Sequence, residues 1–216
     1  MNSRRVLIVE DDPLLQSLIA DLLTSENCEV QVASSAAEGK NTALTFDPDV
    51  ALVDIELGSG PNGIDLAEYI REQLPHVAIV LLTHLPDPRF LGENSRSIPK
   101  GVSYVRKDSI AKRGALLAVV ETAAGEHAKH VMRDDLDPDR PLAGLSRSQI
   151  GVLRAIAMGY SNAEIAERRG TSIRAVEHLI GRTFQAVGID SASSTNSRTT
   201  AALAYVTSAG IPLSHE

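Results

Sequence analysis

The sequence has one cysteine, no tryptophan and few aromatic residues, which make up 3% of its 216 residues. The single thiol, Cys28, excludes an intramolecular disulfide and fits a reducing compartment, the cytoplasm. No apolar run approaches the roughly 18 residues that a membrane span requires. The N-terminus leads through a short apolar stretch into acids, which argues against a signal peptide. We therefore expect a cytoplasmic protein that has no membrane partner.

Charge is distributed unevenly along the chain. Residues 1–144 carry 14 Lys+Arg against 23 Asp+Glu, a balance of −9. Residues 145–216 contain no lysine and carry 7 Arg against 5 acids, a balance of +2. An acidic front and a mildly basic rear indicate two domains with different partners. The net charge of +2 on residues 145–216 permits nucleic-acid binding but does not by itself indicate it.

The front region alternates short apolar runs with helical patterns. The runs typical of buried strands are 4–9, 29–33, 49–54, 77–82 and 102–106. Helices are expected from Pro13, from Ser35 with Glu38 as its capping-box partner, over 63–74, and from Asp108 or Ser109 to about 127–130. Strands that alternate with helices predict an α/β fold, a doubly wound parallel sheet with right-handed crossovers.

Polar residues stand where these strands end. They are Glu10 and Asp11, then Asp54, Thr83 and Lys107. In an open parallel sheet these ends share one edge, where ligands bind. Carboxylates held close together repel each other unless a cation lies between them, and Mg²⁺ suits oxygen ligands. A metal ion plus a lysine neutralises a phosphoryl group, which predicts phosphoryl transfer onto Asp54.

Residues 4–125 resemble the receiver domain of two-component response regulators. The matching pieces are Val-Leu-Ile-Val-Glu10-Asp11-Asp12-Pro, Asp-Val-Ala-Leu-Val-Asp54, Leu-Leu-Thr83 and Tyr104-Val-Arg-Lys107-Asp-Ser. The resemblance implies a flavodoxin-like sheet of order 2-1-3-4-5 and a sensor histidine kinase as phosphoryl donor. Asp54 would be the phosphoacceptor, Thr83 and Lys107 would contact the phosphoryl oxygens, and Tyr104 would turn inward on activation.

The same resemblance implies how Mg²⁺ would be held. Asp11, Asp54 and the backbone carbonyl of Glu56 would bind the ion, and Glu10 would assist through water.

Two features depart from the family pattern. The loop between Asp54 and Gly63 is longer than usual. After Thr83 come His84, expected at the surface or partly packed, and a segment to residue 99 whose prolines leave room for about two helical turns at most.

The rear region is purely helical in pattern. Ser146, Ser161 and Ser172 are expected to cap three helices that end near Gly159, Gly170 and Gly188, and a fourth runs over 197–208. Residues 145–189 resemble the LuxR/NarL-type DNA-binding domain, a small all-α helix-turn-helix fold. The matching pieces begin at Leu145-Ser-Arg-Ser-Gln, Gly159-Tyr-Ser161-Asn162-Ala-Glu164 and Thr171-Ser172-Ile-Arg174. Residues 190–196 form an insertion before the last helix, which in the family often serves dimerisation.

The expected DNA-binding residues lie on the third helix of this region. They are Arg174, Glu177, His178 and Arg182. Glu177 stands where the family usually has lysine, and a carboxylate that faces phosphates opposes binding. It would instead accept a hydrogen bond from cytosine N4. Solvated surface charges are the alternative for all four residues.

We predict a response regulator with a receiver domain over 1–130, a linker over 131–144 and a helix-turn-helix domain over 145–216. It would bind double-stranded DNA, regulate transcription and form a homodimer. It would not be an enzyme beyond its own phosphorylation and dephosphorylation. One alternative is a helical domain that binds a protein partner or acts independently of phosphorylation. A second is a phosphohydrolase that uses Asp54, which is disfavoured because Glu56 stands where such enzymes carry Asp.

Overall fold

We analysed a computed structural model, which describes residues 3–58, 60–91, 96–110, 114–125, 131–189 and 197–211. The chain divides into two compact units. The first contains Met1–Thr83 and Arg96–Asp134, and the second contains His84–Ser95 and Asp135–Glu216. Each unit is described by itself.

The first unit is built on a five-stranded parallel sheet of order β2-β1-β3-β4-β5. The strands are β1 (Arg5–Val9), β2 (Glu29–Ala33), β3 (Val50–Asp54), β4 (Ala78–Thr83) and β5 (Ser103–Arg106). The sequence prediction of a doubly wound sheet with this order is confirmed. The order reverses between β1 and β3, which is the switch point where such sheets bind ligands.

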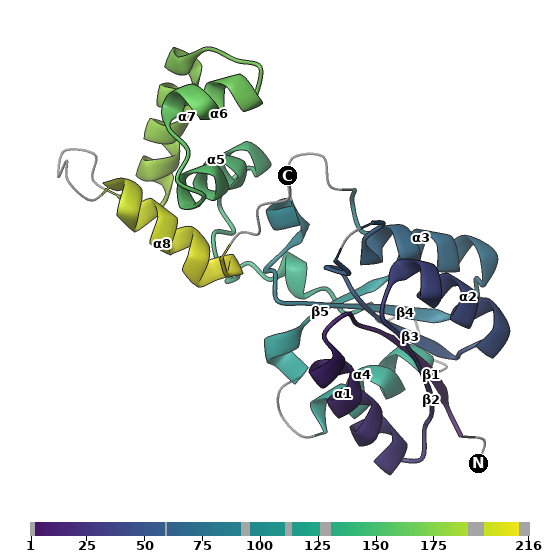
Figure 1. The fold of residues 1–216 in the computed structure, drawn as a ribbon. Helices are drawn as coiled ribbons and strands as arrows, with labels where there is room; N and C mark the ends of the chain where they lie inside the picture. Colours follow the sequence, from purple (N-terminus) through teal and green to yellow (C-terminus); the bar gives the residue numbers. More distant parts are fainter. Residues whose placement is uncertain are drawn as a thin grey trace. The chain divides into compact units, whose positions relative to one another are not determined.

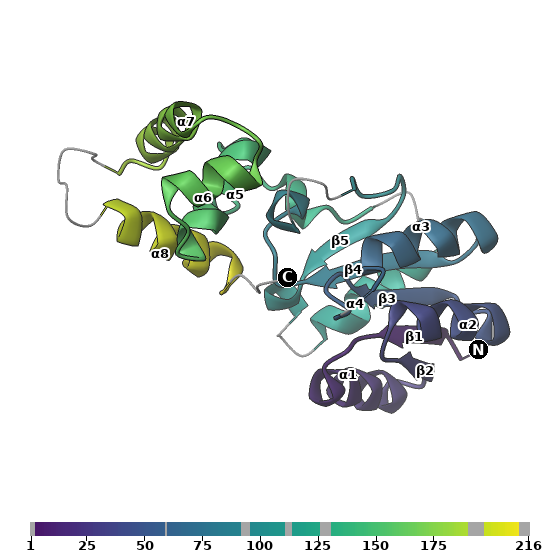
Figure 2. The ribbon, with the colours of Figure 1, turned by 45° about the horizontal axis from the view of Figure 1, so that its top comes forward.

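Helices cover both faces of this sheet (Figures 1 and 2). They are α1 (Pro13–Ser25), α2 (Ala36–Phe46), α3 (Gly63–Gln73) and α4 (Ala115–Ala124). Helices α1 and α4 enclose one apolar core with alternate residues of the strands, such as Ile8, Leu52 and Val80. Helices α2 and α3 pack together on the opposite face. All five residues of β3 are buried, as expected for a central strand covered on both faces.

Side-chain caps fix where the helices begin next to the strand ends. The Asp12 carboxylate accepts hydrogen bonds from the amides of Leu14 and Leu15, and Pro13 occupies the first turn of α1. The expected capping box of α2 is only half correct. Ser35 accepts from the Glu38 amide, but the Glu38 carboxylate binds the amide and hydroxyl of Ser34.

The chain after β5 differs from the long helix that the sequence predicts. Lys107–Ile110 form a 3₁₀ turn, η2, and α4 begins only at Ala115. Gly114 precedes α4 in a left-handed conformation (φ 88°), so no side chain caps this helix. Glycine adopts this conformation at no steric cost, and it interrupts the expected helix. The helix ends at Ala124, where Gly125 has an extended backbone, so it also stops short of the expected end at 127–130. Residues 126–130 themselves lie outside the described residues.

Residues just beyond the expected receiver extend the sheet edge. The Tyr104 amide donates to the Met132 carbonyl (2.7 Å), and Tyr104 bridges Arg133 in parallel register. The Asp134 carboxylate accepts from the Arg106 amide (2.9 Å). The first part of the expected linker 131–144 is therefore hydrogen-bonded to β5. A short 3₁₀ turn, η3 (Asp134–Leu136), follows it.

The second unit contains the expected helices. They are α5 (Arg147–Ala157), α6 (Asn162–Arg168), α7 (Ile173–Ala186) and α8 (Ser197–Ala209). Ser146, Ser161 and Ser172 cap α5, α6 and α7, as predicted, and the first two form complete capping boxes. Their apolar faces meet in one core that includes Ile150, Val176 and Phe184. The insertion 190–196 lies outside the described residues.

Residues 84–91 pack with this second unit. They contain one 3₁₀ turn, η1 (Pro88–Leu91), which agrees with the expectation of two helical turns at most. Leu85 and Phe90 belong to the core formed by α5–α8. Contacts alone do not establish which segments fold independently, so the domain bounds 1–130 and 145–216 stay a prediction.

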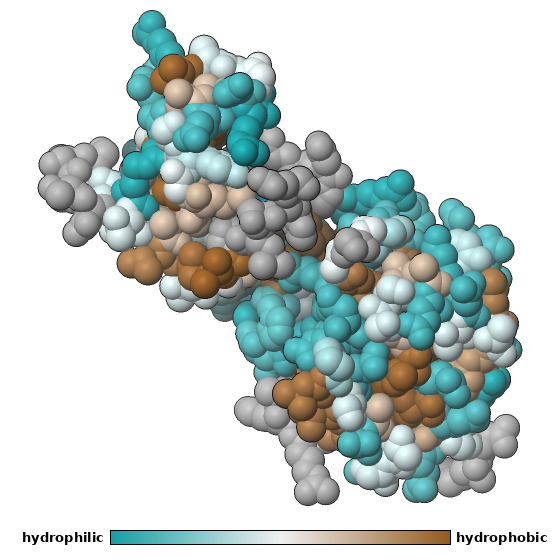
Figure 3. Space-filling view, in the orientation of Figure 1, coloured by the Kyte–Doolittle hydropathy of each residue, from teal (hydrophilic) through white to brown (hydrophobic). Residues whose placement is uncertain are grey.

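The surface shows scattered apolar patches among polar side chains (Figure 3). The exposed large apolar residues include Leu14 and Leu18 on α1 and Leu203 on α8. Within the described ranges, no helix combines the length and the apolar character needed to cross a bilayer.

Candidate functional site

Three charged side chains meet at the carboxyl ends of β1, β3 and β5. The Lys107 ammonium group lies 2.8 Å from Glu10 Oε2 and 2.8 Å from Asp54 Oδ2. The three side chains are only 8%, 3% and 7% exposed, in the order Lys107, Glu10, Asp54. Parallel strands bring these ends to one edge of the sheet. Lys107 therefore contacts Asp54 and Glu10, although they precede it in the sequence by 53 and 97 residues. The predicted convergence of Glu10, Asp54 and Lys107 is present in the structure.

Burial governs the electrostatics of this cluster. Desolvation, followed by repulsion from Asp54, raises the pKa of Glu10 to about 7 despite its bond to Lys107. Burial by itself lowers the pKa of Lys107, but the charges and hydrogen bonds of Asp54 and Glu10 outweigh it, so this pKa is raised. The lysine therefore stays protonated. Two buried carboxylates that share one cation retain unsatisfied negative charge.

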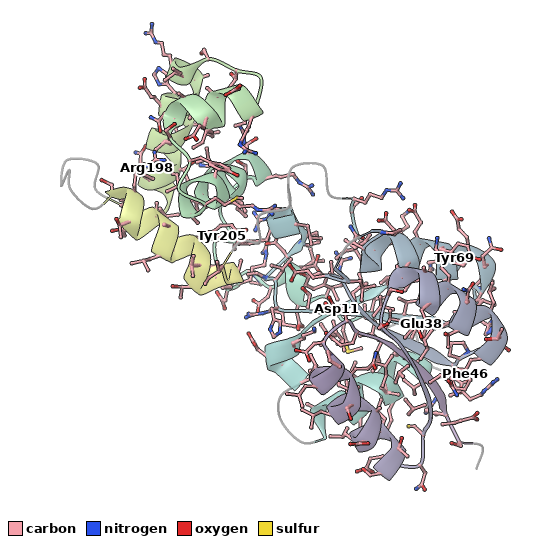
Figure 4. The ribbon with its side chains drawn as sticks, in the orientation of Figure 1. Asp11, Glu38, Phe46, Tyr69, Arg198 and Tyr205 are labelled. Carbon is pink, nitrogen blue, oxygen red and sulfur yellow. The ribbon has the colours of Figure 1, made fainter. Side chains whose placement is uncertain are left out.

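Asp11 adds an exposed carboxylate beside the buried pair. Single oxygens of Glu10, Asp11 and Asp54 all lie within 4.8 Å of one another. This all-oxygen donor set, in which burial and then repulsion from Asp54 raise the pKa of Glu10, fits a hard divalent cation. Figure 4 labels Asp11 in this region. The Glu56 side chain is exposed and contributes no carboxylate to the group, while its amide donates to Asp54 Oδ1 (3.2 Å).

Thr83 and Tyr104 lie on the neighbouring strands β4 and β5. Thr83 is the last residue of β4 and is fully buried. Tyr104 is also fully buried. His84, which directly follows Thr83, is exposed, in agreement with the expected surface position.

Two positioning contacts were not predicted from the sequence. The Gln16 amide nitrogen donates to the carbonyls of Glu10 and Ala33 (both 2.9 Å) and so joins α1 to the ends of β1 and β2. Gly63 donates its amide to Ile55 and lies against the backbone of Asp54. A Cβ atom at Gly63 would lie 2.0 Å from the Asp54 carbonyl oxygen. The spacing of Gly63 behind Asp54 was visible, but this close approach requires coordinates.

The expected DNA-binding residues lie in the second unit. Arg174, Glu177, His178 and Arg182 are all exposed on α7, while Val176 and other apolar residues of that helix face the core. A cavity of about 360 Å³ lies beside one of them, Arg182. Its lining includes Ser148, Arg169, Thr171 and Arg182.

Comparison with known proteins supports the interpretation of the first unit. Residues 6–96 match the family model described as "Response regulator receiver domain". The oxygen regulatory protein NreC of Staphylococcus haemolyticus is 26% identical over 190 residues, which cover 80% of this chain and 86% of the relative. NreC of Staphylococcus aureus matches with the same identity and coverage. The chain belongs to the two-component response regulators.

The likeness of this response regulator to solved structures extends over both units. A structure described as two RcsB dimers bound to two parallel DNAs aligns with a TM-score of 0.55 and 20% identity. The alignment covers 96% of this chain and 99% of the other. At this identity the likeness shows the fold, a receiver followed by a helical region.

The packing of Gly63 makes a prediction for the stability of this response regulator. We expect Gly63→Ala to lower the free energy of unfolding by about 1–3 kcal/mol, because the added methyl group collides with the Asp54 backbone. Urea denaturation of the full-length variant would measure this. Gly144→Ala is the matched control, since a Cβ there meets no atom within 4 Å. Equal stability of the two variants would contradict the packing argument.

Proposed function

We propose that a sensor histidine kinase phosphorylates this protein on Asp54, and that the phosphorylated state controls transcription through DNA binding by the helical unit. The observation that carries this proposal is the buried cluster in which Lys107 bridges Glu10 and Asp54 (2.8 Å to each). The protein would act in the cytoplasm as a homodimer. Its membership of the response regulators supports the proposal.

The residues of the site suit the transfer of a phosphoryl group. A carboxylate oxygen of Asp54 would attack phosphorus and form an acyl phosphate, while the bond from phosphorus to the donor breaks. The Lys107 ammonium group would move from the Asp54 oxygen to a phosphoryl oxygen. The Thr83 hydroxyl would donate a hydrogen bond to another phosphoryl oxygen. Both residues reduce the charge that develops on the phosphoryl group.

Mg²⁺ is the cofactor that the donor set fits best. Asp11, Asp54 and the Glu56 carbonyl would hold the ion directly, and Glu10 would hold it through water. The ion would supply charge neutralisation at the phosphoryl oxygens. Tyr104 lies on β5, which pairs with β4. Its burial supports the proposal that it is the aromatic residue that responds to phosphorylation.

The helical unit would contact DNA through α7. Its exposed residues Arg174, Glu177, His178 and Arg182 would face the major groove, as in a recognition helix. The adjoining cavity, with Arg169, Arg182 and two hydroxyl side chains, has the chemistry of a phosphate contact. The solved relative described as dimers bound to DNA supports both the DNA partner and the homodimer.

Two observations favour a different partner for the helical unit. Its charge balance is only +2, and Glu177 occupies the exposed face of α7. A domain that binds a protein instead of DNA would tolerate both features. Salt separates these functions, because DNA affinity falls steeply with ionic strength through counterion release.

The proposed function is tested by selecting bound sequences from a random duplex library. The selection would run with and without Mg²⁺ and beryllofluoride, a mimic of the phosphoryl group. We expect enrichment of a two-fold-related motif, stronger with the mimic. Equal enrichment in both conditions would retain DNA binding and remove phosphorylation control. No enrichment by the folded protein would favour the protein-binding alternative.

A further inference from the structure

The segment between β4 and β5 leaves the first unit immediately after the phosphorylation site. Thr83 ends β4 at the site, and residues 84–91, which we call the strap, belong to the second unit. The chain returns to the first unit at Arg96, whose guanidinium group pairs with Glu68 and Asp65 on α3. Both ends of this excursion are therefore attached to the first unit.

Apolar contacts hold the strap in the core of the helical unit. Leu85 and Phe90 are 5% and 3% exposed and pack among buried residues of α5–α8. The Phe90 ring lies 5.6 Å from the ring of Tyr205 on α8 (labelled in Figure 4). Arg154 on α5 donates to the Leu91 carbonyl (3.4 Å). The strap thus contacts the first and the last helix of the unit.

Polar contacts fix the strap a second time. Arg89 donates to Asp87 and to the carbonyls of Leu142, Ala143 and Leu145, which lead into α5. Arg140 donates to the same Asp87 carboxylate (2.9 Å). Asp87 is only 2% exposed, so these charge-assisted bonds form in a water-poor environment.

We propose that the strap transmits the phosphorylation state of Asp54 to the helical unit. This inference rests on the proposed phosphorylation. A phosphoryl group adds charge and acceptor oxygens at Asp54, and these attract the Thr83 hydroxyl. Because Thr83 is bonded to His84, its displacement pulls on the strap and loosens its contacts with α5 and α8. Reciprocally, a partner that holds α5 and α8 in the docked arrangement would weaken phosphorylation.

Hydrogen exchange of the full-length protein, with and without Mg²⁺ and beryllofluoride, tests this coupling. We expect the mimic to protect the ends of β3 and β4 and to speed exchange in the strap, α5 and α8 by about five-fold or more. Protection at the strand ends with unchanged exchange in the strap, α5 and α8 would overturn the strap proposal. No response at the strand ends would instead overturn the phosphorylation of Asp54.

A variant that lengthens the strap separates transmission from folding. Two glycines inserted between Thr83 and His84 would leave the contacts of Phe90 and Arg89 in place but absorb the displacement. We expect this variant to keep the strand-end response to beryllofluoride and to lose the response of α5 and α8. The same insertion after Gly210, an exposed glycine beyond α8 where a Cβ meets no atom within 4 Å, is the control and should leave both responses intact. Full transmission through the insertion at Thr83 would contradict the role of the strap.

Discussion

We expect Asp54→Asn to abolish the Mg²⁺-dependent incorporation of phosphate from a small donor such as acetyl phosphate. An amide has no carboxylate oxygen to form the acyl phosphate, and no neighbouring group replaces it. Glu10 is buried and bonded to Lys107, and Asp11 is exposed beside them. The rate should fall by about three orders of magnitude or more, as when other nucleophiles are removed. Gel separation of phosphorylated from unmodified protein would measure it.

Glu56→Gln is the matched control for this experiment. It also removes one carboxylate near the site, but it keeps the backbone carbonyl and the amide that donates to Asp54 (3.2 Å). We expect its phosphorylation to stay within a few-fold of the wild-type rate. The control also separates the response regulator from a phosphohydrolase, in which Glu56 would serve as the general acid. Phosphate incorporation into Asp54→Asn at the wild-type rate would exclude Asp54 as the acceptor.

The sheet and its polar edge were predictable because the relevant signals are local and periodic. A buried parallel strand reads as a short apolar run, and its last residue marks the edge of the sheet. Glu10, Asp54 and Lys107 each follow such a run, so topology alone brings them together. The helix caps Ser146, Ser161 and Ser172 were predictable for the same reason, since each serine stands directly before an apolar helical pattern.

The strap could not be predicted because its partners are distant in sequence and its pattern has no period. Leu85 and Phe90 are isolated apolar residues among prolines, which in a sequence resemble an exposed loop. Phe90 contacts Tyr205, a residue far from it in the sequence. The delayed start of α4 also escaped prediction, because Gly114 was not recognised as a left-handed residue. The position of the strap depends on tertiary packing rather than on local propensity.

The second large effect is expected at Asp87, which neutralises two cations inside the helical unit. Its carboxylate accepts from the Arg89 side chain (2.8 and 2.5 Å) and from Arg140 Nε (2.9 Å). We expect Asp87→Asn to lower the free energy of unfolding of this unit by about 3–5 kcal/mol, because two guanidinium groups lose their counter-charge in a buried site. Urea denaturation followed by circular dichroism of the helices would measure the loss. Asp139→Asn, at an exposed position nearby, is the control and should change stability little.

Acid should narrow the difference in unfolding free energy between wild type and Asp87→Asn. Burial alone would raise the pKa of Asp87, but the hydrogen bonds and charges of Arg89 and Arg140 outweigh it and hold this pKa below its ordinary value of 3.8. A carboxyl with a depressed folded pKa stabilises the protein above its unfolded pKa and loses that contribution as the pH falls through the folded pKa. The gap in unfolding free energy should therefore be full at neutral pH and shrink below about pH 4. A gap that persists unchanged at low pH would show that Asp87 stabilises this unit through packing rather than through its charge.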